Sequence, residues 1–127
     1  MRDMIHWSQA IQTFLIENQR PPINPAGRLT FKKKFIYQIS PYLTVLRLTD
    51  WWGGPYNIWI GFNPKKYGIS LDSPEYFIIA SFGKDRIMEA WQYDPQNPKK
   101  GQYKITTIED FNKDIVLLNG NFIRWPY

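Results

Sequence analysis

Residues 50–56 read Asp-Trp-Trp-Gly-Gly-Pro-Tyr, and residues 57–62 continue as Asn-Ile-Trp-Ile-Gly-Phe. Two glycines and a proline between a carboxylate and an apolar alternation predict a sharp chain reversal that leads into a β-strand. Either glycine can adopt a positive φ angle, and the proline favours extended geometry at the residue before it. A ligand site is the alternative reading of this stretch, but a well-built turn is the simpler one. We therefore expect a structural role for Asp50, Trp52, Gly53, Gly54, Pro55 and Tyr56.

Three further stretches predict a β-sheet. Residues 56–62 place Tyr56, Ile58, Ile60 and Phe62 on one face of a strand, whereas residues 76–82 are apolar on both faces, as expected of a central strand. At the end of the chain, residues 115–118 and 121–125 flank Asn119-Gly120. An Asn-Gly pair between apolar runs is typical of a two-residue type I′ hairpin, because both central residues need positive φ.

The beginning of the chain has the period of an amphipathic helix. Apolar residues recur at intervals of three and four from residue 4 to residue 15, and prolines at positions 21 and 22 must end the helix before them. Within this stripe, Trp7, Ile11 and Phe14 are expected to face the sheet. A weaker helical pattern over residues 31–48 is interrupted at Ser40-Pro41, which predicts a short helix and a break.

Together these patterns predict an α+β fold, in which an N-terminal amphipathic helix packs on a small antiparallel β-sheet that closes with a C-terminal β-hairpin. The 127 residues are enough for one hydrophobic core, so we expect a single domain over residues 1–127. Its parts are the helix at about residues 2–19, a helix-to-sheet loop at about residues 20–55, and the sheet region at about residues 56–127. A short strand is also expected at residues 88–93.

The composition excludes several classes of function. The chain has no cysteine, which rules out disulfides, thiol catalysis and cysteine-based zinc sites. It has one histidine, His6, without a partner for metal binding, and we find no nucleophile elbow or phosphate-binding glycine loop. We therefore expect that the protein is not an enzyme. The net charge is +5, but the basic residues are scattered along the chain, so nucleic acid is not an expected partner.

The order of these motifs is similar to that of a known family. The Asp-x-Trp-Gly-x-Pro-Tyr motif at residues 50–56, a strand, residues 76–81 (Tyr-Phe-Ile-Ile-Ala-Ser) and residues 82–85 (Phe-Gly-Lys-Asp) together resemble the soluble domain of type II secretion pseudopilins, especially the major one. Type IV pilins are the wider relatives. Residues 10–22 also resemble the family's helix end, with phenylalanine at position 14 in place of the usual tyrosine.

The resemblance implies a pilin-like domain that serves as a structural subunit of a secretion pseudopilus or a type IV pilus-like filament. Its expected partners are other pilin or pseudopilin subunits. Its expected location is the bacterial cell envelope, outside the cytoplasm in the periplasm or beyond, and tied to the inner membrane by an N-terminal apolar anchor. No run in this chain approaches the roughly 18–20 apolar residues of a membrane helix, so this anchor is absent from the sequence as given.

The resemblance also implies a cofactor, because major pseudopilins hold calcium in the loop between their late strands. Matching the family's motifs to this chain points to Asp85, Asn112 and Asp114 as the calcium ligands. Oxygen ligands of this kind suit calcium. Two alternatives remain at this stage. The carboxylates are either solvated loop residues, or they pair with Arg86, which stands where the family usually has a glycine.

A second class of function is a small binding module of the cell envelope. In this reading the protein is a minor pilin that captures nucleic acid or a secreted protein through its basic loops and exposed rings. Basic pairs such as Lys65-Lys66 and Lys99-Lys100, together with an aromatic content of 17%, are the features behind this alternative.

Overall fold

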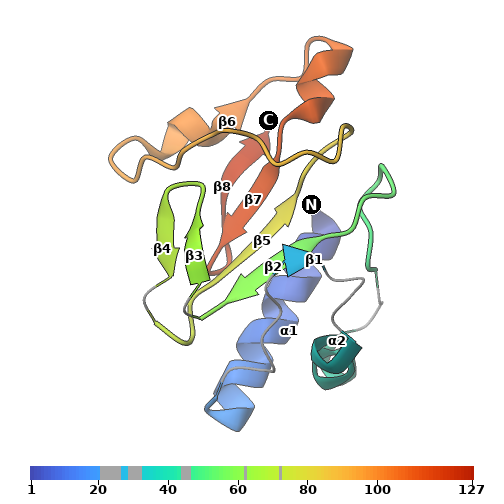
Figure 1. Cartoon of the computed structure of the whole chain (residues 1–127), viewed down its shortest axis with the longest axis vertical. Coiled ribbons are helices and arrows are strands. Elements are labelled where there is room, and N and C mark those ends of the chain that lie inside the picture. The colour runs from blue at the N-terminus through green and yellow to red at the C-terminus, as the bar shows by residue number, and fades with distance from the viewer. Residues whose placement is uncertain (21–26, 29–32, 44–46, 62, 72) are drawn as a thin grey trace.

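The computed structural model describes residues 1–20, 27–28, 33–43, 47–61, 63–71 and 73–127. It contains a long N-terminal helix, a shorter second helix, one mixed sheet and a separate two-stranded hairpin (Figure 1). The helices are α1 (Arg2–Asn18) and α2 (Lys33–Ile39). The strands of the main sheet, in spatial order, are β1 (Gly27–Arg28), β2 (Asn57–Ile60), β5 (Phe77–Ser81), β7 (Ile115–Leu118), β8 (Asn121–Pro126) and β6 (Gln102–Tyr103). The hairpin consists of β3 (Asn63–Lys66) and β4 (Ile69–Leu71).

The predicted α+β class is confirmed, but the prediction that the sheet is antiparallel is wrong at one edge. There, β6 runs parallel to β8, with Gln102 paired to Trp125. Residues 88–93 do not form the expected strand. Conversely, the β3–β4 hairpin and the short β1 were not predicted. Short 3-10 helices at Ser40–Tyr42, Pro98–Gly101 and Ile108–Asn112 complete the elements.

The N-terminal helix ends where the sequence requires. Gln19 takes a left-handed conformation with φ of 50°, and its N–H donates to the carbonyl of Leu15, which closes the last turn just before the prolines. The second helix ends as predicted at the serine-proline break, since α2 stops at Ile39. Neither helix among the described residues has the length and hydropathy needed to span a membrane.

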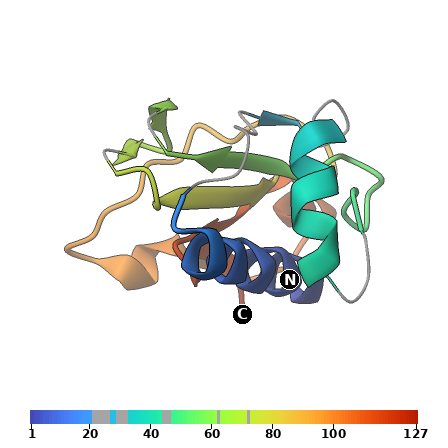
Figure 2. The same cartoon turned by 90° about the horizontal axis from the view of Figure 1, so that it is seen from below.

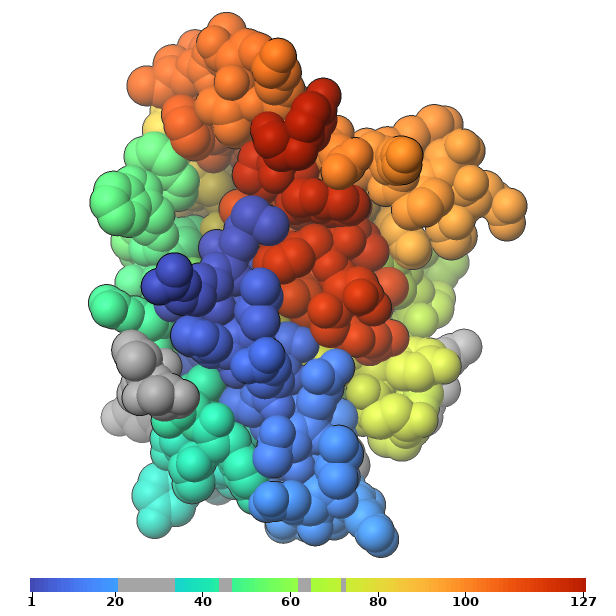
Figure 3. Space-filling view, turned by 180° about the vertical axis from the view of Figure 1, so that it is seen from behind, coloured from blue at the N-terminus to red at the C-terminus, as the bar shows by residue number. Residues whose placement is uncertain are grey.

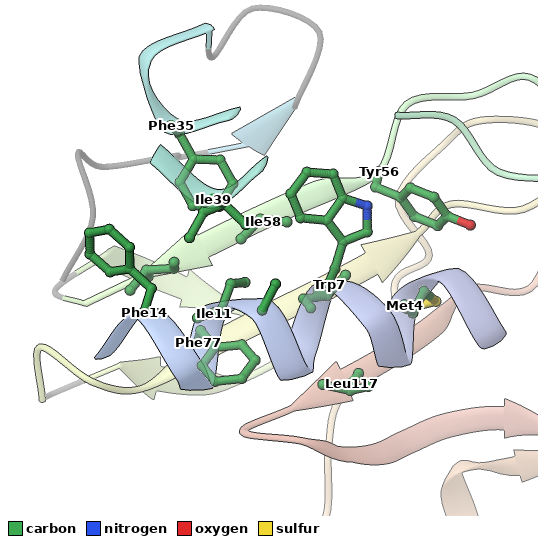
Figure 4. Close-up of a cluster of buried hydrophobic side chains, with 13 residues drawn as sticks. Met4, Trp7, Ile11, Phe14, Phe35, Ile39, Tyr56, Ile58, Phe77 and Leu117 are labelled. Carbon is green, nitrogen blue, oxygen red and sulfur yellow. The ribbon is translucent and has the colours of Figure 1, made fainter. Parts of the chain in front are cut away.

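The helix packs lengthwise against one face of the sheet and buries its apolar stripe there (Figures 1 and 4). Trp7, Ile11 and Phe14 are all buried in the core that α1 forms with the sheet and α2. The Trp7 ring stacks on Phe35 of α2, and its Nε1 donates to the carbonyl of Arg47 at 2.8 Å. Figure 2 shows α1 lying below the sheet, whereas α2 stands upright beside the strands, from the level of α1 to the level of β1.

The opposite face of the sheet carries a second core. Trp59, Ile78 and Val116 from three neighbouring strands pack there against Tyr67 and Leu71 of the β3–β4 hairpin region. All five residues of β5 are buried, so this strand is central, as its uniformly apolar sequence predicts. The sheet is therefore covered on both faces.

The C-terminal hairpin is confirmed in its predicted form. Asn119 and Gly120 have φ angles of 49° and 97°, as the two central positions of a type I′ turn require. The side chain of Asn119 also accepts the backbone N–H of Phe77 at 2.8 Å, while its own N–H donates to the Phe77 carbonyl at 3.0 Å. The turn is thereby joined to the beginning of β5.

The two faces of α1 give a matched pair of substitutions. Ile11 is 0% exposed, whereas Ile16 on the same helix is 75% exposed. We expect Ile11→Ala to lower the free energy of unfolding by about 2–5 kcal/mol, because it removes buried methyl groups and leaves a cavity. Ile16→Ala should change it by no more than about 0.5 kcal/mol. Urea denaturation of both variants measures the difference, and equal losses would contradict the packing of α1 on the sheet.

Candidate functional site

The turn at residues 50–56 is built around the carboxylate of Asp50. Its Oδ1 accepts the backbone N–H groups of Trp52 at 3.0 Å and Gly54 at 2.9 Å. Its Oδ2 accepts the hydroxyl of Ser81, the last residue of β5, at 2.6 Å. Gly53 has the positive φ of 76° that the turn needs. These bonds fix the turn on the central strand and leave neither Asp50 oxygen without a donor.

Arg86 covers this turn from the side. Its Nη2 donates to the carbonyl of Trp52 at 2.6 Å, and a Cβ atom added to Gly53 or Gly54 would lie 3.0–3.1 Å from the Arg86 side chain. Arg86 itself has a φ of 58°, a backbone conformation that favours glycine. Within the described residues, no ion pair joins Arg86 to Asp85 or Asp114. The Arg86 guanidinium therefore holds the turn and does not pair with the carboxylates of Asp85 and Asp114.

The structure brings together the two loops that carry the three predicted calcium ligands. The N–H of Lys84 donates to the carbonyl of Phe111 at 2.8 Å. Gly83, with a φ of 79°, packs so closely on this loop that an added Cβ would lie 2.9 Å from the Lys113 carbonyl oxygen. The pairing of Ser81 with Ile115 places both loops at the same end of the sheet. Loop 83–86 and loop 111–114 are thus direct neighbours.

The three predicted ligands differ in their surroundings. Asp85 is exposed, and its Oδ1 accepts the N–H of Ile87 at 3.0 Å. Asn112 is half-buried, and its Oδ1 is a buried atom that has no hydrogen-bond partner among the described residues. Asp114 is fully buried, and its Oδ1 likewise has no partner within that part of the chain. Two of the three side chains therefore carry an unpartnered, buried oxygen.

The second oxygen of Asp114 is fully engaged. Oδ2 accepts the Tyr67 hydroxyl at 2.6 Å and the backbone N–H of Glu89 at 3.0 Å. Burial raises the pKa of the Asp114 carboxyl to about 7, aided by the negative charges of Glu89 and Asp85 and opposed by these two hydrogen bonds. Burial and the Asp114 charge also raise the pKa of Tyr67, which keeps its hydroxyl protonated as a donor.

A buried ion pair adjoins Asp114. Arg124 of β8 binds Glu89 through both carboxylate oxygens, with Nη2 to Oε2 at 2.7 Å and Nε to Oε1 at 3.1 Å. Glu89 Oε1 also accepts the N–H of Asp114 at 3.1 Å. The guanidinium lies over the rings of Tyr103 at 4.7 Å and Trp91 at 5.3 Å. Such a bidentate, ring-flanked pair orients the backbone around Asp114 and offsets part of the Glu89 charge.

Sequence reasoning missed Tyr67, Glu89 and Arg124 as members of this site. The one available signal was Arg124, a single cation within the mostly apolar stretch 121–126. A buried charge rarely lacks a counterion, so this residue indicated an ion pair. The sequence did not identify Glu89 as the counterion, because Glu89 lies in a segment without regular secondary structure. Tyr67 comes from the turn between β3 and β4, a hairpin that was not predicted.

The site offers oxygen ligands of the kind that hard cations prefer. Among the described residues, no three His, Cys, Asp or Glu side chains gather closely enough to hold a metal ion. A cation bound between the two loops would thus rely on amide, carbonyl and water oxygens beside the carboxylates. The unpartnered Oδ1 atoms of Asn112 and Asp114 fit this requirement.

The turn gives a test that separates backbone strain from crowding. Gly53→Val should lower the free energy of unfolding by about 1–3 kcal/mol, because a β-branched residue is strained at positive φ. Gly54 has no positive φ, so Gly54→Val should cost less, mainly through contact with the Arg86 side chain. In an Arg86→Ala background the Gly54→Val cost should shrink and the Gly53→Val cost should persist. Thermal and urea denaturation measure both, and no loss for Gly53→Val would contradict the turn.

No protein-family model, no curated protein and no solved structure matches this chain.

Proposed function

We propose that this chain is a structural subunit of a secretion pseudopilus or a type IV pilus-like filament. The observation that carries the proposal is the arrangement of α1, whose one face is buried on the sheet while its other face remains at the surface (Figure 3). Large apolar side chains occur on that open face, where Ile5 is 40% exposed and Ile16 is 75% exposed. A helix with apolar side chains on two faces suits a subunit that packs one face on its own sheet and the other on neighbouring subunits.

The order of the elements supports the same proposal. The Asp50 turn connects the helical part of the chain to β2, and the Gly83-Lys84-Asp85 loop follows the central strand β5. The resemblance to pseudopilins implies these positions for the two motifs. In the proposal, the domain lies in the bacterial cell envelope outside the cytoplasm, and an apolar helix continuous with α1 ties it to the inner membrane.

Fractionation of the source cells tests this proposal. An antibody against the purified domain should detect a form larger than 15.2 kDa that stays in the membrane fraction after a high-salt wash and is also found in sheared filaments. A band of about 15.2 kDa in the cytoplasm would overturn the proposal. A form released from the envelope by salt would instead favour a binding module held by charge.

We further propose that the neighbouring loops 83–86 and 111–114 bind calcium, with Asp85, Asn112 and Asp114 as side-chain ligands. The support is the pair of buried Oδ1 atoms, of Asn112 and Asp114, that have no donor in the part of the chain that the structure describes. Leaving such an atom unsatisfied costs about 1–3 kcal/mol, and a cation would remove that cost. Bound calcium would also join the loop after β5 to the loop before β7.

Melting curves in millimolar calcium and in chelator test the calcium proposal. Binding to the folded state alone should stabilise it by about 2.7 kcal/mol when calcium exceeds its dissociation constant a hundredfold. Asp114→Asn should abolish this shift, since it removes the charge but keeps an oxygen for Tyr67 and Glu89. Glu109→Ala, at an exposed residue of the 3-10 helix, is the control and should keep the shift. Coincident curves for the unmodified chain would contradict the proposal.

A further inference from the structure

One tryptophan of the Asp50 turn projects fully into solvent. Trp51 is 91% exposed, whereas the adjacent Trp52 packs its ring on Phe111 at 5.3 Å between centroids. A tryptophan ring buries about 150–250 Å² when it is covered, and tryptophan is enriched among the residues that dominate protein interfaces. The turn beneath it is fixed by Asp50 and Arg86, so Trp51 stands on a rigid base.

An apolar groove of about 400 Å³ lies at another corner of the molecule. Its walls are the C-terminal half of α1, with Leu15 and Ile16, and the beginning of β5, with Tyr76 and Phe77. Ile16 is 75% exposed and Tyr76 is 40% exposed, so the groove presents apolar surface to solvent. In the space-filling view, this part of α1 borders the yellow segment around residues 73–77 (Figure 3). The groove is large enough to take an aromatic side chain.

The projecting ring and the groove lie at opposite ends of the same pair of strands. In the antiparallel register, Asn57 pairs with Ala80 at one end of β2 and β5, and Ile60 pairs with Phe77 at the other. The Asp50 turn precedes the first pair, while Tyr76 precedes Phe77 in the second. Figure 3 accordingly shows the green turn and the yellow segment at opposite corners of one face. Trp51 therefore cannot reach the groove of its own molecule.

The charges beside the two surfaces are complementary. Arg86 lies against the turn that carries Trp51, and it is exposed. Glu75 lines the groove and is exposed. Arg20 lines a neighbouring pocket together with Glu75, and its guanidinium lies over the Phe14 ring at 5.8 Å. A cation beside the ring and a carboxylate beside the groove favour one orientation of a contact between them.

We propose that Trp51 of one copy of this chain docks in the Leu15–Ile16–Tyr76 groove of the next copy, with Arg86 facing Glu75. Because the two surfaces differ and lie at opposite ends, the contact is head-to-tail, and repetition of it gives an open filament rather than a closed dimer. The inference rests on the proposed function as a filament subunit, and it names the surfaces through which successive subunits meet.

The chain has no cysteine, so single cysteines placed on each surface report the contact directly. Thr49→Cys, two residues before Trp51, and Gln12→Cys, on the groove wall, are both at exposed positions and leave Trp51 and Ile16 in place. The two variants are purified separately, one with an affinity tag, then mixed at high concentration and oxidised mildly. The mixture should form the mixed disulfide dimer at least about tenfold faster than Thr49→Cys mixed with Tyr37→Cys, a tenfold difference corresponding to about 1.4 kcal/mol of association. Tyr37 is the control position because it is 82% exposed on α2 and does not line the groove. Trp51→Ala in the Thr49→Cys partner and Glu75→Lys in the Gln12→Cys partner should each slow the reaction.

Equal rates for the two mixtures would overturn the proposed contact. Fastest cross-linking of Thr49→Cys with itself would overturn it too, because that result indicates a symmetric contact between two identical surfaces. Cross-linking is measured on the purified chain, so it tests the contact alone. If the contact fails but the source cells contain a membrane-anchored form, only this inference is overturned. If the source cells contain a cytoplasmic pool, the proposed function is overturned, whatever the cross-linking rates.

Discussion

The carboxylate of Asp50 is the constraint on which the rest of the sheet depends. Its two oxygens accept two backbone N–H groups of the turn and the hydroxyl of Ser81 at the end of β5. Hydrogen bonds to a charged acceptor are stronger than neutral ones, so the turn is held against the central strand before β2 begins. The register of β2 on β5 follows from that point. So does the outward direction of Trp51, because the chain cannot rotate the turn without breaking these bonds.

Both faces of the central strand β5 are apolar and must be buried, and different segments of the chain pack on each face. On one face, α1 and α2 provide a continuous apolar core. On the other, the β3–β4 hairpin region and the irregular segment with Met88, Trp91 and Tyr93 lie over the strands. The irregular segment cannot satisfy its backbone groups through a ladder, and it uses single bonds instead, such as Tyr93 N–H to the Tyr67 carbonyl at 2.9 Å. The Glu89–Arg124 pair then joins it to β8.

Local patterns predicted the parts of the fold that local chemistry determines. The 3.6-residue period of α1, the apolar run of β5 and the Asn-Gly turn of the last hairpin are all present in the structure. Of the face predicted for the strand at residues 56–62, Tyr56, Ile58 and Ile60 lie together in one core while Trp59 lies in the other, and Phe62 lies outside the described residues. The β3–β4 hairpin escaped prediction because its first strand reads Asn-Pro-Lys-Lys, which has no apolar alternation. The parallel β6 edge and the absence of a strand at residues 88–93 depend on neighbours distant in sequence. The resemblance to pseudopilins pointed to Asp85, Asn112 and Asp114 in loops 83–86 and 111–114, whereas Tyr67, Glu89 and Arg124 reach the site through contacts between segments distant in sequence.

Two aspartates at the same end of the sheet illustrate how geometry separates a structural carboxylate from a candidate ligand. Asp50 has a donor on each oxygen, so its charge is compensated by the fold itself. Asp114 is more deeply buried, yet within the described residues its Oδ2 has donors and its Oδ1 has none. Burying a carboxylate oxygen without a donor is unfavourable, and the raised pKa of Asp114 expresses that cost. Either a proton or a cation can relieve it. The Oδ1 of Asn112 in the same loop also has no donor among the described residues, and this favours the cation, because one proton on Asp114 serves a single acceptor whereas a metal ion binds several oxygens at once.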